Sequence, residues 1–195
     1  MDRVTGDIIR YEREHPGELI HVDVKKIGRV PDGGGWRVLG REQGRANRTR
    51  GTGYDYLHVA IDDHSRIAFV QAHRDERGTT CAQFLTDAFA FFAELGINVE
   101  RVMTDNAKNY VTSRAFQDAL GDRKHKRIRP YRPQTNGKVE RFNRTLTHEW
   151  AYAHTFNSND ERLATLNDWL HDYNWQRTHS AIGNHPPASR LPSTT

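Results

Sequence analysis

The sequence predicts an α/β domain, in which a mixed β-sheet carries helices on both faces. Two observations lead to this class. Three strand-like segments linked by antiparallel turns come first, and helical and strand-like segments then alternate to give the order β–β–β–α–β–α–β–α–α. A strand that follows a crossover helix normally lies parallel to a strand already in the sheet, so a five-stranded mixed sheet is expected. The 195 residues suit one ordinary domain.

The first strand is predicted over Glu18–Ile27, because apolar and polar residues alternate there with the period of two that a half-buried strand shows. One face holds β-branched residues and the other holds polar ones. The first set is Ile20, Val22 and Val24, and the second is His21, Asp23 and Lys25.

A glycine- and arginine-rich segment, residues 28–53, follows. Its eight glycines and six arginines cannot form a core, so we expect a flexible, basic insertion between two strands. The next two strands, residues 54–63 and 65–74, are joined by a tight turn at Asp62–Ser65 and form a hairpin. In that turn we expect Asp62 and Asp63 to be turn residues.

In the rest of the chain, predicted helices and strands alternate. A helix with Phe84, Ala88, Phe91 and Leu95 at helical spacing ends at Gly96, and a short helix begins at Ser113 and ends at Gly121. Strands are predicted over residues 98–105 and 125–131, and further helices over 136–154 and 159–178. We divide the chain into an N-terminal arm or linker (1–17), a core (18–180) with the insertion 28–53, and a C-terminal tail (181–195).

Composition narrows the class of protein. The single cysteine, Cys81, excludes an internal disulfide and a cysteine-rich zinc site. No signal peptide and no membrane-spanning run of about 20 apolar residues is present, so we expect a cytoplasmic protein without a membrane partner. Between Arg123 and Arg144 nine basic residues accompany one acid, whereas the net charge of the whole chain is only +4. This clustering indicates a polyanionic partner.

Three carboxylates stand out against their surroundings. Asp23 lies in mid-strand, where Asp is disfavoured, although an exposed position on an edge strand would also explain it. Asp105 ends a predicted strand, where ligands bind in open α/β sheets, although it could simply cap a turn. Glu140 lies one turn into a basic helix, and pairing with Arg144 would be enough to explain it.

The fold could bring these three carboxylates together if the strand that ends in Asp105 returns beside the first strand. Crowded carboxylates repel one another, and a divalent cation removes that penalty. Oxygen ligands alone suit Mg²⁺ or Mn²⁺, and two such ions can stabilise the attacking and leaving oxygens of phosphodiester cleavage.

Three blocks carry a resemblance to a known family. The segments "HVDVKKI", "MTDNAKNY" and "RPYRPQTNGKVERFNRTL" resemble the integrase catalytic core of bacterial insertion-sequence transposases and retroviral integrases. The hairpin "YDYLHVAIDDHSR" and the tail "YNWQRTHSAIGNHPPASRL" are similar to the same family, so the resemblance covers most of residues 18–191. It implies a ribonuclease H-like fold in which Asp23, Asp105 and Glu140 bind two Mg²⁺ or Mn²⁺ ions. Where the family leads us to expect glycine after Asp105 and Asn106, this chain has Ala107, which would be strained at a positive φ.

The resemblance implies a DNA transposase or integrase domain, a polynucleotidyl transferase that cuts and joins DNA strands during transposition. Its partners would be element ends, target DNA and at least one further copy of the chain. We expect the DNA backbone to contact a basic group of residues at and before the third block: Arg129, Arg132, Asn136, Lys138, Arg141 and Arg144. Two alternatives stay open, namely a ribonuclease H-like nuclease of another specificity and an inactive DNA-binding remnant of a transposase.

The remaining histidines and tryptophans suggest no chemistry. We expect most of a group of four histidines to lie at the surface: His21, His125, His148 and His179. Three tryptophans occupy helical positions, and we expect them in the core rather than against nucleic-acid bases: Trp150, Trp169 and Trp175.

Overall fold

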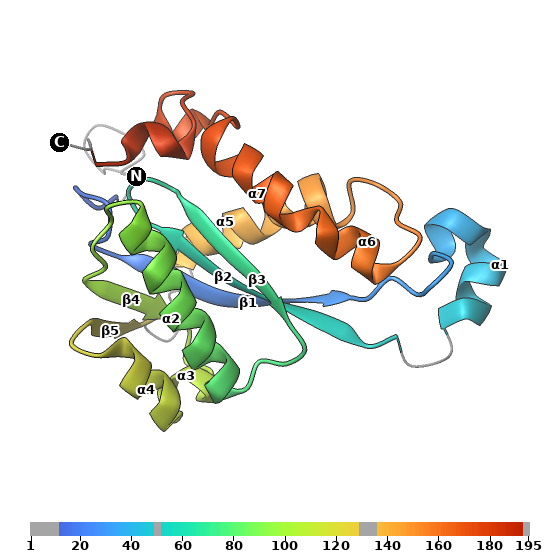
Figure 1. Cartoon of the computed structure of the whole chain (residues 1–195), viewed down its shortest axis with the longest axis horizontal. Coiled ribbons are helices and arrows are strands. Elements are labelled where there is room, and N and C mark those ends of the chain that lie inside the picture. The colour runs from blue at the N-terminus through green and yellow to red at the C-terminus, as the bar shows by residue number, and fades with distance from the viewer. Residues whose placement is uncertain (1–11, 49–51, 129–135, 193–195) are drawn as a thin grey trace, which may run out of the picture.

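The computed structural model describes residues 12–48, 52–128 and 136–192. Its centre is a five-stranded mixed sheet with the strand order β3-β2-β1-β4-β5 (Figure 1). The predicted number and kind of strands are therefore confirmed. The strands are β1 (Ile20–Gly28), β2 (Tyr54–Asp62), β3 (Ala68–His73), β4 (Arg101–Thr104) and β5 (Lys124–Arg127).

The pairing of the strands follows the predicted connections. β1 with β2 and β2 with β3 pair antiparallel, as strands joined by direct turns or insertions can. β4 returns after a helix and pairs parallel with β1, and β5 pairs parallel with β4. The strand that leads to Asp105 therefore lies next to the strand that holds Asp23.

Helices cover both faces of the sheet (Figure 1). One face carries α2 (Gly78–Glu94), α3 (Lys108–Val111) and α4 (Arg114–Leu120). The other carries α5 (Gly137–Leu146), the π-helical turn η2 (Thr147–Ala151), α6 (Asn159–Ala164) and α7 (Leu166–Trp175). Two 3-10 turns, η3 (Ser180–Ile182) and η4 (Pro187–Arg190), follow.

Two apolar clusters hold these layers together. Ile20 and Val22 pack in the cluster under α2 and α4, together with the buried Phe84 and Phe116. The cluster on the opposite face packs residues of β2 and β3 against Val139, Phe142 and Leu146 of α5. Each such fully buried side chain contributes roughly 1.5–3 kcal/mol. The alternation predicted for the first strand is confirmed, since its apolar residues enter the first cluster and its polar face points towards α5.

The long helices differ from the prediction in detail. The helix expected over 136–154 continues beyond Leu146 as the π-helical turn η2. The helix expected over 159–178 is divided at Thr165, whose hydroxyl donates to Arg162 O (2.9 Å) and accepts from Trp150 Nε1 (3.0 Å). A threonine that bonds locally in this way competes with the helical pattern. Trp150 is buried as expected, while Trp169 and Trp175 are only partly covered.

The expectation of a flexible insertion is wrong for half of its length. Trp36–Arg48 forms the helix α1, interrupted at Gly40, whose φ of 79° is left-handed. Arginine, leucine, glutamate and glutamine favour helices strongly enough to offset the scattered glycines. Most side chains of α1 are nevertheless exposed, so the segment adds no core, as predicted.

A buried histidine on β2 makes the stability of the fold depend on pH. His58 is fully buried, donates from Nε2 to Asp75 O (2.9 Å) and packs against Phe84. Burial lowers the pKa of His58 to about 4 from an ordinary 6.5. Between these two values the unfolded chain binds a proton that the folded chain does not. His58 alone should therefore remove about 1–2 kcal/mol of stability on going from pH 7 to pH 5.

Urea unfolding of the wild type and His58→Gln at pH 7 and pH 5 measures this contribution. The variant should lose less stability than the wild type on acidification. His15→Gln, at an exposed position, is the control and should keep the full pH dependence. Equal losses in the wild type and His58→Gln would contradict the assignment.

Candidate active site

Asp23 lies in the middle of β1 on the face that carries α5. It pairs across the sheet with Val59 of β2 and is partly buried. Asn143, a buried residue of α5, donates from Nδ2 to Asp23 Oδ2 (2.7 Å). The carboxylate is therefore held by the sheet below it and by the helix above it. The edge-strand alternative is wrong, because β1 is the central strand of the sheet.

Asp105 follows directly on β4 and comes beside Asp23 through the strand register. The parallel pairs Ile20↔Val102 and His21↔Met103 share an offset of 82 residues (102 − 20 and 103 − 21), and the same offset relates 105 to 23. Asp105 Oδ1 accepts from the Ala107 backbone N–H (2.9 Å), as the turn-capping alternative expected. Ala107 has a φ of −63°, so the strain expected at this position does not exist.

Glu140 lies in the first turn of α5 and is exposed. It lines the same surface depression as Asp23, with a volume of about 420 Å³. Lys25 and Arg144 supply positive charge to this depression. Glu140 and Arg144 are both described, and no ion pair joins them within 4.0 Å. The simple helix salt bridge therefore does not explain the glutamate.

The carboxylates influence one another electrostatically. Burial, and to a smaller extent the negative charges of Asp105 and Glu140, raise the pKa of Asp23 to about 6, although hydrogen bonds from the Val24 backbone and from Asn143 act in the opposite direction. Across the described ranges, no three Asp, Glu, His or Cys side chains converge closely enough to hold a metal ion. The three carboxylates are therefore neighbours that do not converge on one point.

The donor set around Asp23 suits a hard divalent cation. All the candidate ligands are oxygens, which Mg²⁺ and Mn²⁺ prefer. Asn143 Oδ1 is buried and has no hydrogen-bond partner in the described part of the chain. A cation, or water bound to one, would satisfy this acceptor and neutralise the charge that raises the pKa of Asp23. The residues present therefore fit such an ion.

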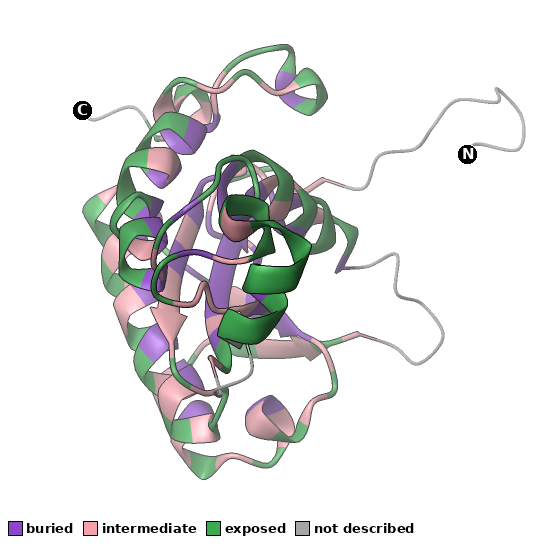
Figure 2. Cartoon of the chain, turned by 90° about the vertical axis from the view of Figure 1, so that its right-hand side faces the viewer, coloured by how far each residue is buried: buried purple, intermediate pink, exposed green. Residues whose placement is uncertain are grey.

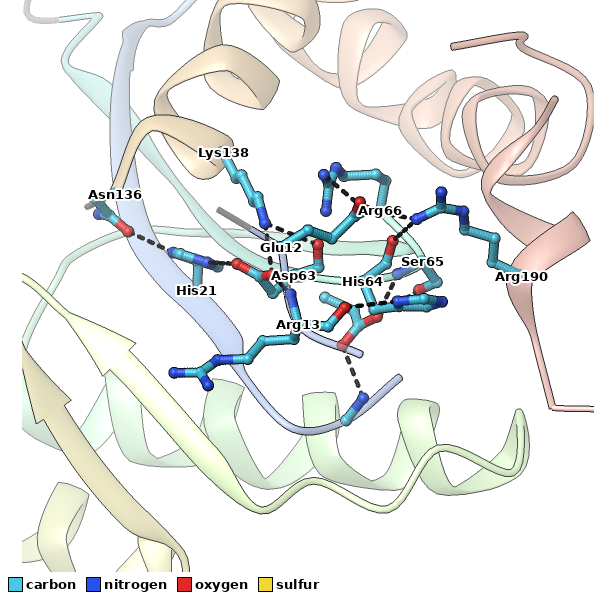
Figure 3. A network of polar contacts seen from close by, with 12 residues as sticks. Glu12, Arg13, His21, Asp63, His64, Ser65, Arg66, Asn136, Lys138 and Arg190 are labelled. Atoms are coloured by element: carbon cyan, nitrogen blue, oxygen red, sulfur yellow. Dashed lines mark hydrogen bonds and ion pairs between the residues drawn. The ribbon is translucent and has the colours of Figure 1, made fainter. Parts of the chain in front are cut away.

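A buried polar network fixes the start of α5, the helix that carries Glu140 (Figure 3). His21 Nε2 lies 2.8 Å from Asp63 Oδ1, and His21 Nδ1 lies 3.0 Å from the Asn136 amide oxygen. Lys138 Nζ lies 2.5 Å from Asp63 Oδ2 and also donates to Asp63 O (3.1 Å). Asp63 and His21 are both buried to within 1% of full burial.

The Asp63 carboxylate is the centre of this network. Burial alone would raise its pKa, but hydrogen bonds from His21, Lys138 and the Arg13 backbone N–H outweigh burial and lower it. The charged form is thus the one that the fold stabilises. Asp63 links the β2–β3 turn to β1, to the start of α5 and to residue 13, so it fixes the helix relative to the strand that holds Asp23.

Comparison with known proteins identifies the family. Two family models, both of the integrase core domain, match residues 13–133 and 122–187. The chain belongs to the integrase core domain family. It is thus a catalytic core domain of the transposase and integrase type, as the sequence blocks implied.

Relatives of this integrase core come from viruses and bacteria. The ORF3 protein of Spiroplasma virus SpV1-C74, named as an integrase, is 24% identical over 71% of this chain and 42% of its own length. An uncharacterised protein of insertion element IS476 from Xanthomonas euvesicatoria is 36% identical over 45% of this chain and 25% of its own length. The chain therefore spans less than half the length of these curated relatives.

Solved structures confirm the fold of the integrase core. The intasome of simian T-cell lymphotropic virus matches with a TM-score of 0.67 and 19% identity, covering 95% of this chain and 60% of the viral chain. The HTLV-2 integrase catalytic core, solved in complex with magnesium, matches with a TM-score of 0.62 and 16% identity over 92% and 99%. The fold is ribonuclease H-like, as expected.

The structure separates the residues predicted to contact DNA. Arg141 and Arg144 are exposed on α5. Asn136 is 4% exposed, and the amine of Lys138 is engaged with Asp63, so both point into the integrase core rather than towards an external phosphate. Arg129 and Arg132 lie outside the described residues. DNA contacts by this group stay predictions.

Several residues of the site were not expected from the sequence. His21 is buried, so the expectation of a surface histidine is wrong for it. Asp62 does serve the turn, accepting from Ser65 N (2.7 Å), whereas Asp63 reaches beyond the turn to α5. The alternation of β1 carried one signal, because it placed His21 on the same face as Asp23. Nothing in the sequence singled out Asn143.

Loss of the Asp63 charge should destabilise the integrase core. Asp63→Asn keeps the size of the side chain but leaves Lys138 without its buried counter-charge, so we expect a loss of about 2–4 kcal/mol in the free energy of unfolding. Denaturant unfolding measures it. Asp122→Asn, an exposed substitution of the same kind, should stay within about 0.5 kcal/mol of the wild type. Similar stabilities of the two variants would refute the anchoring role of Asp63.

Proposed function

We propose that this domain cuts and joins DNA strands in transposition, with Asp23, Asp105 and Glu140 as its catalytic carboxylates. The observation that carries the proposal is the placement of the three carboxylates, because the strand register brings Asp105 beside Asp23 and Glu140 lines the same depression as Asp23. Neighbouring carboxylates around a partly buried Asp23 repel one another, and this repulsion costs stability. Such an arrangement is useful for holding cations against a phosphate.

Asp23, Asp105 and Glu140 would hold two Mg²⁺ or Mn²⁺ ions. Divalent cations bound there would polarise the phosphodiester and stabilise the negative charge on the attacking and leaving oxygens. Asn143 would fix the orientation of Asp23 through the 2.7 Å hydrogen bond, and its free Oδ1 would face the same ions or their water. The HTLV-2 integrase core, solved with magnesium, is consistent with this choice.

The reaction is two successive substitutions at phosphorus. In the first, water attacks a phosphodiester at the end of the element, a new P–O bond forms, and the departing oxygen becomes the 3′-hydroxyl of the cut strand. In the second, this 3′-hydroxyl attacks a target phosphodiester in line and displaces a target 3′-oxygen. We call the depression that Asp23 and Glu140 line the catalytic depression. The chain itself would orient the phosphate there, since Lys25 and Arg144 also line the depression and Arg141 is exposed on the same helix as Arg144.

The partners follow from this chemistry. We propose element ends and target DNA as substrates, and at least a dimer as the active form, because two ends must be joined to one target. The HTLV-2 core has been solved in a dimeric and a trimeric form, which supports an oligomer. In the described residues no helix is long and apolar enough to cross a membrane. We place the reaction in the bacterial cytoplasm, where element and chromosomal DNA lie.

Substitution of the carboxylates tests the proposed function. Asp105→Asn and Glu140→Gln keep shape and remove charge. Each should lower Mn²⁺-dependent nicking and strand transfer on DNA oligonucleotides by more than the roughly 10- to 100-fold that loss of an outer-shell partner costs. Asp122→Asn and Glu94→Gln, at exposed positions elsewhere, are matched controls and should retain activity.

The outcome separates the alternatives. Unchanged activity in both carboxylate variants would refute the three-carboxylate site. Cleavage of RNA–DNA hybrids with none of DNA ends would favour a nuclease of another specificity. DNA binding without any Mn²⁺-dependent cleavage by the wild type would favour an inactive remnant.

Metal binding can be measured without activity. Mg²⁺ should raise the thermal midpoint of the wild type, by the equivalent of about 2.7 kcal/mol at a concentration 100 times its Kd. Asp23→Asn should abolish most of this gain. Without metal the same variant should be about 1–2 kcal/mol more stable than the wild type at pH 8, because a desolvated charge is removed. Equal Mg²⁺ responses of wild type and variant would exclude Asp23 as a ligand.

A further inference from the structure

The large apolar side chains that are exposed in the described residues gather at one end of the molecule. They are Trp36 (60% exposed), Val38 (41%), Tyr54 (53%) and Tyr152 (46%). Figure 1 shows α1 projecting beyond the far end of β1 and β2, and in Figure 2, where this end faces the viewer, α1 is almost wholly exposed. Exposed aromatic groups gathered in this way mark a binding surface.

The same end of the molecule is rich in positive charge. Arg37, Arg41 and Arg45 of α1 are all exposed, and the single acid of the helix is Glu42. In the sequence, residues 28–53 hold six arginines against Asp32 and Glu42, a net +4 that equals the charge of the whole chain. We call Trp36, Tyr54 and Tyr152, together with Arg37, Arg41 and Arg45, the α1 platform.

The α1 platform is built into the fold. Arg37 Nη1 donates to Tyr152 O (2.6 Å) and so ties α1 to the end of η2. Asn47 Nδ2 donates to Asp32 O and Gly34 O and closes the loop before the helix. Between α1 and η2 lies an apolar hollow of about 290 Å³, lined in part by Trp36, Tyr152 and Phe156.

Two elements connect the α1 platform to the catalytic depression. On β1, Asp23 and Lys25 line the depression, whereas Gly28 lines the hollow under α1 together with Arg29, which follows the strand. Thr147 and His148 of η2 line the first, whereas Ala151 of η2 and the following Tyr152 line the second. The five residue-to-residue steps of strand from 23 to 28 span about 17 Å, which is the length of about five nucleotides at 3.4 Å each.

We propose that the α1 platform binds DNA that leaves the catalytic depression, with unpaired bases near the cut stacked on its aromatic side chains. The arginines of α1 contact the backbone of the same strand. This proposal rests on the proposed function, since it places the DNA at Asp23. Aromatic side chains interleaved with arginine are typical of single-strand binding, because every base has a face on which an aromatic ring can stack.

Charge favours DNA over a protein partner as the occupant. Aromatic residues and arginine are also enriched in protein interfaces. A second copy of this chain, however, would bring an equally basic platform against this one and would be repelled. A polyanion that already passes Lys25 and Arg144 meets the arginines of α1 at the far end of these connecting elements.

Binding of fluorescein-labelled DNA to the full chain, followed by anisotropy without Mn²⁺, tests the proposal. The wild type should bind a forked duplex with unpaired ends more tightly than a blunt duplex of equal length. Trp36→Ala should weaken binding of the fork about 5- to 100-fold and remove its advantage over the blunt duplex. The pair Arg41→Glu and Arg45→Glu should weaken binding of both DNAs.

A charge-matched control distinguishes the α1 platform from the general charge of the chain. The pair Arg77→Glu and Arg114→Glu also changes the net charge by −4, at side chains that are 81% and 94% exposed elsewhere. It should weaken binding several-fold less than the α1 pair. Equal effects of the two pairs, or equal binding of the fork by Trp36→Ala and wild type, would overturn the proposal. So would a lower molar mass of Trp36→Ala in light scattering together with unchanged DNA binding, since this would identify a protein interface.

Failure of this proposal can be told apart from failure of the proposed function. The anisotropy measurement needs no catalysis, so it tests binding to the α1 platform even if the wild type does not nick DNA. If the α1 platform binds DNA as proposed, its variants should still nick DNA in the presence of Mn²⁺ when the substrate is saturating. Loss of nicking at saturation, in variants with an unchanged thermal midpoint, would overturn the assignment of the platform to binding alone.

Discussion

The side-by-side placement of two carboxylates, Asp23 on β1 and Asp105 just after β4, is the constraint on which the site depends. The parallel register of β1 and β4 brings Asp105 to the level of Asp23, in a partly buried position where charge is poorly solvated. Neither strand can slip to relieve the repulsion. A slip by one residue would turn Ile20 and Val22 out of the first apolar cluster and bring polar residues into it. Because burial of the apolar face of β1 fixes the register, Asp23 and Asp105 stay close together despite their repulsion.

Contacts from α5, on the polar face of β1, limit the electrostatic cost of this repulsion. Asn143 donates to Asp23 from α5, and α5 is itself fixed at its start by Lys138 and Asn136. These contacts converge on His21 and Asp63, which are buried among the strands. The network itself contains an ion pair between Lys138 and Asp63, next to the site. It gives α5 one position relative to β1, and in that position Glu140 lines the same depression as Asp23, from the exposed side of the helix.

The sequence predicted the sheet well, because the period of two in β1 and the order of the elements are strong local signals. The neighbourhood of Asp23 and Asp105 followed from the preference for parallel return after a crossover helix. The network around Asp63 could not be predicted, because it joins positions 21, 63, 136 and 138 through contacts that no local pattern encodes. Asn143 was missed for a similar reason, since a single asparagine on a basic helix belongs to no periodic pattern that would mark it. Helix α1 was missed because its glycines outweighed its helix-favouring residues in our interpretation.

The basic stretch that contains Glu140 divides its residues between two tasks. Asn136, just before α5, and Lys138 and Asn143, on the inner side of the helix, hold the helix and Asp23 in place. The residues on the outer side, Glu140, Arg141 and Arg144, remain exposed. A glutamate on the outer side that made an ion pair with its neighbour would be neutralised and of little use to a cation. Because no pair joins Glu140 to Arg144, its charge stays available in the depression that Asp23 also lines. The single acid in this basic helix is therefore placed where a cation would join it to the sheet.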